Sequence, residues 1–284
     1  MGARIDEIDL NRPLSGDDYR RILRALGEHG VLCFPKQDLS VEGHVAFAAR
    51  FGELEVNVAS TGFTEPGHPE AMVLSNMKQD GKPLGLHDAG QDWHTDMSYS
   101  QVISMCNILY AKAVPMRHGK PLGETQFRNM HAAYEELPEE IKAKLAGKTA
   151  THDFNKYWEV ARHRPGSPRK ALTPEQRAKK PPVSHPIFMK HPITGKFVLY
   201  ADPGYTMWID GMDRTESDLL LDFLFRHQLR ADFFYAHHWA VGDVLMWDNI
   251  GTVHNAVADY TMYEPRYMRR TQVMATLDYA SLVA

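Results

Sequence analysis

Long apolar runs are missing from this 284-residue sequence: no stretch approaches the roughly 18 apolar residues of a membrane-spanning helix. The first residues also lack the apolar core of a signal peptide. Cysteine is scarce, since Cys33 and Cys106 are the two, and each lies in a short apolar run, which favours reduced thiols in the cytoplasm. Basic charge is not in excess, because 32 Lys and Arg stand against 36 Asp and Glu, for a net charge of -4. These absences argue against a nucleic-acid or membrane partner and favour a small molecule.

Apolar residues make up 43% of the chain, enough to build a substantial core. The N-terminal region predicts a helix, a strand and a second helix. Ser15 can cap the first helix, which we expect to end at Gly27 and Gly30. The run 31–34 indicates a buried strand, and 40–51 indicates the second helix.

Short strand signals dominate the rest of the chain, a pattern typical of a sheet sandwich. They fall at 71–75, 108–113, 196–201, 233–241, 244–248 and 268–277. Gly242 and Asp243 predict a two-residue hairpin turn, so the strands on either side of them are expected to pair antiparallel.

Two further helices, at 130–146 and 216–229, interrupt the strands and are expected to pack outside the sheets. Thr215 and Asp218 have the spacing of a capping box at the start of the second one. The segment 156–182 is rich in proline, lysine and arginine, and we interpret it as a long surface excursion. Its positive charge can attract anionic substrates, although such a run is more often a solvated face.

A candidate metal site begins with His94 and Asp96, whose spacing on a strand would place both side chains on one face. His254, which follows a predicted strand, is the candidate third ligand. Two histidines and one carboxylate leave three positions of an iron ion open, for a chelating 2-oxo acid and oxygen. With 15 histidines in the chain, a His-x-Asp pair is by itself more often a coincidence than a ligand pair, so the accompanying residues decide.

Three basic side chains, Arg266, Arg269 and Arg270, follow His254 closely in the sequence. One arginine can anchor the distal carboxylate of 2-oxoglutarate through a bidentate pair. Alternation along a strand would place Arg266 and Arg270 on the same face, whereas Arg269 would face away as a solvated strand residue.

A set of motifs resembles the taurine and dichlorophenoxyacetate dioxygenase family, and the resemblance covers nearly the whole of residues 1–284. The motifs are His94-Thr95-Asp96, Gly123-Glu124-Thr125, Trp247-Asp248-Asn249, His254 and 266–270. The segments 127–138 and 238–249 look closer to the aryloxyacetate branch than to the taurine branch. The resemblance implies a mixed, mainly β fold in one domain, with a double-stranded β-helix, or jelly-roll, core and flanking α-helices.

The same resemblance implies roles for individual residues. His94, Asp96 and His254 would bind iron(II), while Thr125 and Arg266 would hold the carboxylate of 2-oxoglutarate. Arg270 would face the anionic group of the substrate. Two departures from the family pattern are a longer loop at 117–121 and the excursion at 156–182, where the family has a variable lid.

For several other residues, the sequence leaves open a role at the site or favours an ordinary core or surface position. His87, in the loop before the first ligands, is a candidate substrate contact, and a solvent-exposed position fits it equally well. Trp93 and Trp247 are expected in the core. The family match places His237 and His238 away from iron. Tyr99 and Tyr205 stay undecided between pocket and core.

The expected function is a dioxygenase that uses iron(II), 2-oxoglutarate and O2 to hydroxylate a small organic anion. The anion is expected to be an aryloxyalkanoate-like carboxylate, cleaved at its ether bond with release of succinate and CO2. Alternatives within the family are hydroxylation of a taurine-like sulfonate, a sulfate ester or an acyl amino acid. A halogenating relative would lack the carboxylate ligand, so Asp96 argues against it. Metal-dependent hydrolysis and a non-catalytic metal-binding jelly roll are weaker rivals, and the sequence leaves open a homo-oligomer.

Overall fold

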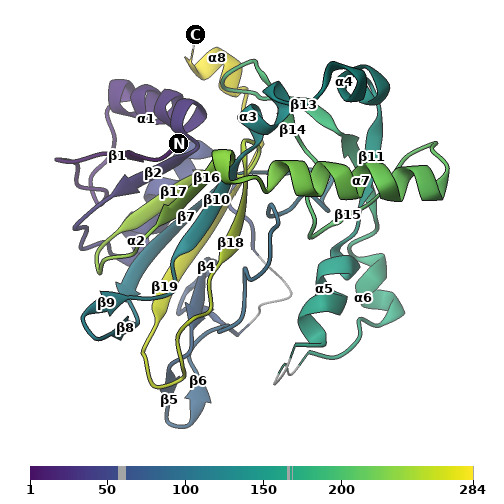
Figure 1. Ribbon diagram of the computed structural model, residues 1–284. Coiled ribbons are helices and arrows are strands. Elements are labelled where there is room, and N and C mark those ends of the chain that lie inside the picture. The colour runs from purple at the N-terminus through teal and green to yellow at the C-terminus, as the bar shows by residue number, and fades with distance from the viewer. Residues whose placement is uncertain (57–61, 165–166, 168, 284) are drawn as a thin grey trace.

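Two sheets face each other in the centre of the molecule (Figure 1). This computed structural model describes residues 1–56, 62–164, 167 and 169–283. In order across the larger, seven-stranded sheet the strands are β1 (Ala3–Arg4), β2 (Val31–Phe34), β17 (Val244–Asp248), β7 (Ser104–Ala113), β19 (Tyr267–Met274), β4 (His68–Ser75) and β3 (Thr64–Glu65). The smaller, three-stranded sheet has the order β16 (Phe234–His237), β10 (Thr125–Asn129) and β18 (Thr252–Ala256).

An apolar layer joins the inner faces of the two sheets. Phe127 of β10 and Trp247 of β17 are buried there, with their ring centroids 5.7 Å apart. Neighbouring strands pair antiparallel, except for the parallel pair β1 and β2. This two-layered, mainly β architecture with helices outside agrees with the predicted jelly roll.

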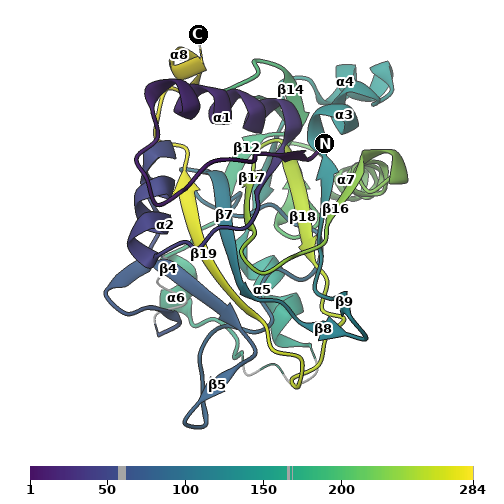
Figure 2. The same cartoon turned by 90° about the vertical axis from the view of Figure 1, so that its left-hand side faces the viewer.

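Two N-terminal helices cover the outer face of the large sheet (Figure 2). α1 (Gly16–His29) begins where Ser15 Oγ accepts the Asp18 N–H at 3.0 Å, and it ends at Gly30, which has a φ of 70°. Gly27 lies inside α1 in contact with Ile193 rather than ending it, so that detail of the prediction was wrong. The predicted strand 31–34 is β2, and the predicted helix 40–51 divides into α2 (Val41–Ala48) and η1 (Ala49–Phe51).

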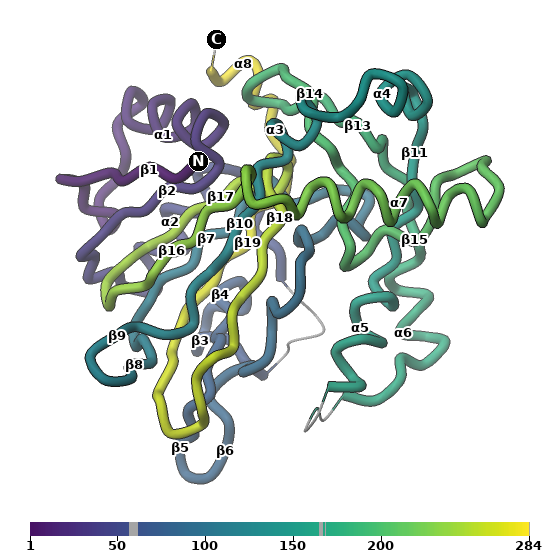
Figure 3. The backbone as a smooth tube through the Cα atoms, in the orientation of Figure 1, coloured from purple at the N-terminus to yellow at the C-terminus, as the bar shows by residue number. Residues whose placement is uncertain are grey.

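Helices and small sheets of the 130–230 region lie on the side of the two central sheets opposite to α1 and α2 (Figure 3). The predicted helix 130–146 is broken at Pro138 into α3 (Met130–Glu135) and α4 (Glu139–Leu145). The helix predicted at 216–229 is α7 (Arg214–Gln228); its cap is Asp213, and Asp218 pairs with Arg214, so the predicted capping box was wrong. The remaining elements of the fold, all of them short, are β5 (Lys78–Gln79), β6 (Lys82–Pro83), β8 (Met116–Arg117), β9 (Lys120–Pro121), β11 (Thr149–His152), α5 (Phe154–Arg162), α6 (Pro174–Ala178), β12 (Val183–Pro186), β13 (Phe188–Lys190), β14 (Phe197–Leu199), β15 (Thr206–Ile209), η3 (Ala231–Phe233) and α8 (Tyr279–Val283).

The segments on either side of Gly242 and Asp243 do not form a hairpin, and that prediction was wrong. β16 ends at His237 and pairs with β10, whereas β17 pairs with β2 and β7 in the other sheet. Asp243 closes a turn by accepting the Ala240 N–H on Oδ2 at 2.9 Å. The chain uses this turn to cross from one sheet to the other.

None of the helices within the described ranges combines the length and the apolar character that crossing a membrane requires.

Candidate active site

His94 and Asp96 lie in a loop, not on the regular strand that the spacing argument assumed. One antiparallel bridge holds this loop against β18: the His94 N–H donates to the His254 carbonyl at 3.0 Å, and the His254 N–H donates back at 2.8 Å. The backbone turns sharply on both sides, because Asp92 and Met97 have φ values of 69° and 62°. The strand-face rationale was therefore wrong, while the assignment of these residues as metal ligands stays a prediction.

The side chains of His94, Asp96 and His254 converge, and their candidate ligand atoms all lie within 4.8 Å of one another. All three residues are buried. His94 Nδ1 lies 2.8 Å from the Asp92 carbonyl oxygen, which can only accept, so Nδ1 carries the proton and Nε2 offers a lone pair. Nε2 is also the atom that faces Asp96 Oδ1, at 3.6 Å. The donor set and its orientation fit a divalent metal ion.

Two donors fix the carboxylate of Asp96. Its Oδ2 accepts from Asn107 Nδ2 at 2.7 Å and from Arg270 Nη1 at 3.0 Å. Both of these bonds go to one oxygen, which leaves Oδ1 available for a metal ion. Although burial raises the pKa of Asp96, the charge of Arg270 and the proximity of His94 together outweigh it and hold that pKa far below its usual value. Asp96 is therefore an anion at neutral pH, as a ligand must be.

The pKa values of His94 and His254 are shifted in opposite directions. Burial lowers the pKa of His254 well below its ordinary value, and the neighbouring His94 adds to the effect. Burial is the largest influence on His94 too, but the negative charge of Asp96, 3.6 Å away, and the Asp92 carbonyl together outweigh it and raise the pKa of His94. Without metal, His94 therefore holds a proton more readily than His254 does. A bound cation would favour the neutral form of both imidazoles.

Arg269 and Arg270 lie on opposite faces of β19, as alternation predicted. Arg270 points to the Asp96 side, whereas Arg269 lies on the other face under α2. Arg269 is not solvated, so that expectation was wrong: it is 1% exposed and donates to the carbonyls of Leu39 and Ser40 at 2.6 and 2.7 Å. Its role in this arrangement is to tie β19 to the start of α2.

Arg266 and Thr125 are both buried, one just before β19 and the other at the start of β10. Within the described parts of the chain, Arg266 Nε has no hydrogen-bond partner, and burial lowers the pKa of this side chain. A buried cation without a paired anion is costly, so a carboxylate ligand fits it. Thr125 Oγ1 accepts from Trp239 Nε1 at 3.1 Å, which leaves the hydroxyl proton free for an anion.

A cavity of about 160 Å³ opens beside His94, Asp96 and Arg270. Aromatic rings form much of its wall, and they are Tyr99, Phe154, Tyr157, Trp158 and Tyr205. Tyr99 and Tyr205, undecided from the sequence, thus line this pocket, with ring centroids 4.6 Å apart. Thr125, Arg266 and His254 are not part of its wall.

The described parts of the segment 156–182, which leave out residues 165, 166 and 168, contribute directly to this wall through residues that the sequence did not single out. Tyr157 and Trp158 lie on α5, and Arg169 follows it. Arg169 forms a bidentate pair with Asp88, and the Tyr157 hydroxyl donates to the Gln91 carbonyl at 2.7 Å. The aromatic residues in 154–162 have helical spacing, and this pattern could have predicted that they share one face of a helix.

The remaining candidates lie elsewhere. His87 is exposed and does not line the cavity, unlike its neighbours Leu86 and Ala89. Trp247 is in the core, whereas Trp93 is half-buried, with the Arg128 guanidinium 4.9 Å from its ring centroid. His237 belongs to a different side-chain cluster.

A jelly roll with two histidines and an aspartate converging beside an arginine-containing cavity defines the class of protein: a 2-oxoglutarate-dependent dioxygenase. The comparisons with known proteins give the family. The sequence profile described as "Taurine catabolism dioxygenase TauD, TfdA family" matches residues 1–272, and the chain belongs to this family, whose enzymes use iron(II), 2-oxoglutarate and O2.

Individual relatives agree with that assignment. The chain is 32% identical over 293 residues to the alpha-ketoglutarate-dependent 2,4-dichlorophenoxyacetate dioxygenase of Cupriavidus pinatubonensis, covering 99% of this chain and 96% of the relative. It is 31% identical over 283 residues to pentalenolactone F synthase of Streptomyces avermitilis, covering 95% and 90%. Among solved structures, AAD-2 in complex with Mn(II) and N-oxalylglycine superposes with a TM-score of 0.81 at 28% identity, covering 97% of this chain and 96% of that one. A resemblance to the aryloxyacetate branch is consistent with these matches.

Proposed function

We propose that this dioxygenase hydroxylates a small aromatic carboxylate, an aryloxyalkanoate-like anion, and cleaves its ether bond. The observation that carries the proposal is a single cavity whose wall contains Asp96 and Arg270 together with a group of aromatic side chains. Sequence similarity alone does not decide the substrate, because relatives named for a phenoxyacetate and for a pentalenolactone are about equally similar. The cavity favours a flat ring joined to a carboxylate.

In this proposal His94, Asp96 and His254 hold iron, which when bound couples oxidative decarboxylation of 2-oxoglutarate to hydroxylation of the substrate. Arg266 and Thr125 receive the distal carboxylate of 2-oxoglutarate. The unpartnered Nε of Arg266 and the free hydroxyl proton of Thr125 support that role.

Arg270 receives the carboxylate of the substrate. Its guanidinium has five N–H groups and uses one for Asp96 and one for Met72 Sδ at 3.6 Å, so others can bind an anion. A charged group fixed this close to Asp96 orients the neighbouring carbon of the substrate toward the metal. Hydroxylation of a carbon attached to an ether oxygen gives a hemiacetal, which collapses to a phenol and a 2-oxo acid.

Tyr157 and Trp158 pack against the aryl ring and exclude water. The segment 156–182 thereby acts as a lid over the cavity, within one domain that spans residues 1–284. Tyr157 lies close to the candidate ligands, with its ring centroid 5.2 Å from that of His94. An aromatic pair of this kind contributes about 0.5–1.5 kcal/mol beyond the area it buries, so an aryl substrate is favoured over an alkyl one.

The test is succinate release, with 2-oxoglutarate-dependent O2 consumption, over a panel of aryloxyalkanoates, alkyl sulfonates, sulfate esters and acylated amino acids. Each aryloxyalkanoate is paired with its neutral amide. We expect the acids to have the highest kcat/KM and their amides to be poor substrates. Equal turnover of acids and amides would overturn the role of Arg270, and preference for a sulfonate would move the enzyme to the taurine-like alternative.

A further inference from the structure

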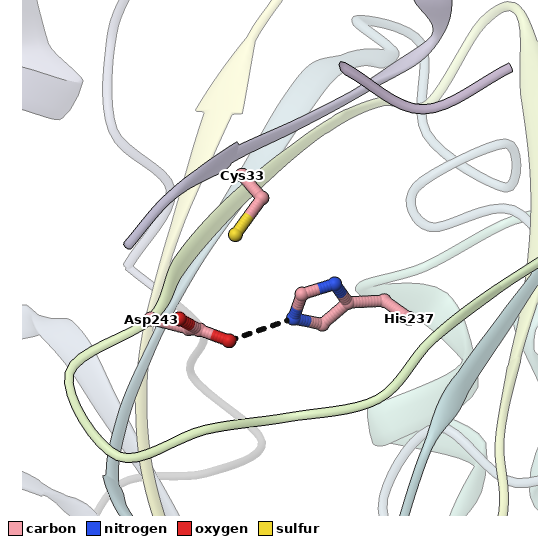
Figure 4. Close-up of side chains that lie close together, drawn as sticks. All are labelled: Cys33, His237 and Asp243. Atoms are coloured by element: carbon pink, nitrogen blue, oxygen red, sulfur yellow. Dashed lines mark hydrogen bonds and ion pairs between the residues drawn. The ribbon is translucent and has the colours of Figure 1, made fainter. Parts of the chain in front are cut away.

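A second group of side chains with metal-ligand chemistry shares no residue with the candidate active site (Figure 4). It consists of Cys33 on β2, His237 at the end of β16 and Asp243 just before β17. One ligand atom from each lies within 4.8 Å of the others, and His237 Nε2 is 3.1 Å from Asp243 Oδ2. The three residues are 8%, 7% and 6% exposed.

We propose that Cys33, His237 and Asp243 form a second metal site that takes a zinc-class divalent cation and links the two sheets. β2 belongs to the large sheet and β16 to the small one, and the turn that ends at Asp243 is the crossing between them. An ion held by all three side chains therefore adds a link to the two already here, the turn and the bond between His237 and Asp243.

The ligand set suits zinc better than iron(II). A thiolate is a soft ligand and selects zinc or copper(I), whereas two histidines and a carboxylate with open positions suit iron(II). A tetrahedral zinc ion with bonds of about 2.0–2.3 Å sets its ligands roughly 3.3–3.8 Å apart, so shifts of about 1 Å close this cluster around an ion. The fourth position is left for water.

Charge and proton balance are favourable. Binding of M²⁺ displaces one proton, that of the Cys33 thiol, to solvent, and the imidazole proton moves from Nε2 to Nδ1 of His237; no electron is transferred. The ion, one thiolate and one carboxylate sum to zero charge, which suits a buried position. Without metal, burial and the nearby Asp243 raise the pKa of Cys33 to about 12, so the thiol is protonated.

A third cluster in the described parts of the chain, formed by His131, His191 and Asp248, does not offer the same chemistry. His191 Nδ1 accepts the backbone N–H groups of Ile193 and Thr194, each at 3.2 Å, so its proton lies on Nε2 and faces Asp248 at 2.9 Å. That imidazole has no lone pair for a metal. For His237, the bond to Asp243 is the one ring hydrogen bond within the described ranges, so its tautomer is free to change.

Cobalt(II) titration of the full chain under anaerobic conditions tests the proposal, because thiolate-bound cobalt has a near-ultraviolet charge-transfer band. The candidate active site contains no cysteine. An exposed histidine that binds cobalt adventitiously supplies no thiolate either, so the band reports the Cys33 site alone. Cys106→Ser is the matched control: this second buried cysteine belongs to none of the metal-ligand clusters in the described ranges.

We expect the unmodified chain and Cys106→Ser to bind two equivalents of cobalt and to show the band. Cys33→Ser and His237→Gln should bind one equivalent and lose the band, and the equivalent that they retain reports that the fold is intact. One equivalent and no band in the unmodified chain would overturn the proposal, whatever the behaviour of the variants. A band that persists in Cys33→Ser would overturn it equally. Neither outcome bears on the dioxygenase activity, which is measured separately.

Discussion

Arg270 donates from Nη1 to Oδ2 of Asp96 at 3.0 Å, so the cation proposed to bind the substrate carboxylate also contacts a proposed metal ligand. The contact gives Arg270 two functions. It fixes which oxygen of Asp96 faces the metal, and it keeps a positive charge at the floor of the cavity. Loss of Arg270 is therefore expected to change both substrate binding and metal affinity, whereas sequence alternation suggested an effect on the substrate alone.

Arg270→Ala should raise the KM for the anionic substrate about tenfold or more, because a charge-assisted hydrogen bond contributes roughly 1.5–3 kcal/mol. Asn107→Ala is the matched control, since Asn107 donates to the same Asp96 oxygen but does not line the cavity. We expect Asn107→Ala to weaken iron binding with little change in substrate KM. Steady-state kinetics and iron titration of both variants separate the two functions; equal effects on KM would contradict the substrate role.

Replacement of His94, Asp96 or His254 by Ala should abolish turnover and weaken iron binding, since two remaining ligands hold the ion poorly. The variants should stay folded without metal, because the apolar layer between the sheets does not depend on it. Metal analysis and circular dichroism provide the measurements. His87→Ala, at an exposed position, is the control and should keep normal activity. Near-normal turnover in Asp96→Ala would remove the site assignment.

Arg266→Ala should raise the KM for 2-oxoglutarate about tenfold or more, through loss of one charge-assisted bond. Arg269→Ala should leave that KM nearly unchanged and instead lower the free energy of unfolding. Its removal leaves the carbonyls of Leu39 and Ser40 without their donor, and each unsatisfied buried group costs about 1–3 kcal/mol. Kinetics and urea unfolding distinguish the two arginines, and the reverse pattern would mean that the co-substrate binds elsewhere.

The convergence of His94, Asp96 and His254 and the jelly roll could be predicted from the sequence because the motifs resemble those of a known family, while their role as iron ligands stays a prediction. The loop geometry around His94 could not, since it depends on one backbone bridge to His254, far along the chain. The false hairpin at Gly242 has the same origin: a turn signal does not reveal which sheet each flanking strand joins. Asn107 was missed because a buried amide in an apolar strand looks like core until its partner, Asp96, is known.

Trp158→Ala should raise the KM for aryl substrates several-fold and change that for an alkyl anion much less. The expected difference follows from the loss of an aromatic contact, worth about 0.5–1.5 kcal/mol beyond area. Val160→Ala on the same helix is the control, because Val160 is 53% exposed and does not line the cavity. Equal losses for aryl and alkyl anions would indicate that Trp158 only supports the fold of α5.

The pair between Asp88 and Arg169 is expected to fasten the segment 156–182 over the cavity. Burial raises the pKa of Asp88, but the hydrogen bond and charge of Arg169 outweigh it, so the pKa in the folded protein is lowered. A lowered folded pKa means that the pair stabilises the protein above the unfolded pKa, about 3.9, and that this contribution is lost as pH falls through the folded value. The fastening should therefore be complete at neutral pH and weaken only below about pH 4.

Asp88→Asn should remove this fastening at neutral pH, because it leaves Arg169 buried without its anion, at a cost of roughly 3–5 kcal/mol for a buried pair. We expect faster amide hydrogen exchange across α5 and a higher KM for the aryl substrate, with 2-oxoglutarate KM unchanged. Glu159→Gln is the matched control, since the Glu159 pair with Arg162 is a partly exposed i,i+3 pair that contributes little. Exchange in α5 that stays as slow in Asp88→Asn as in Glu159→Gln would show that the aromatic contacts alone hold the segment in place.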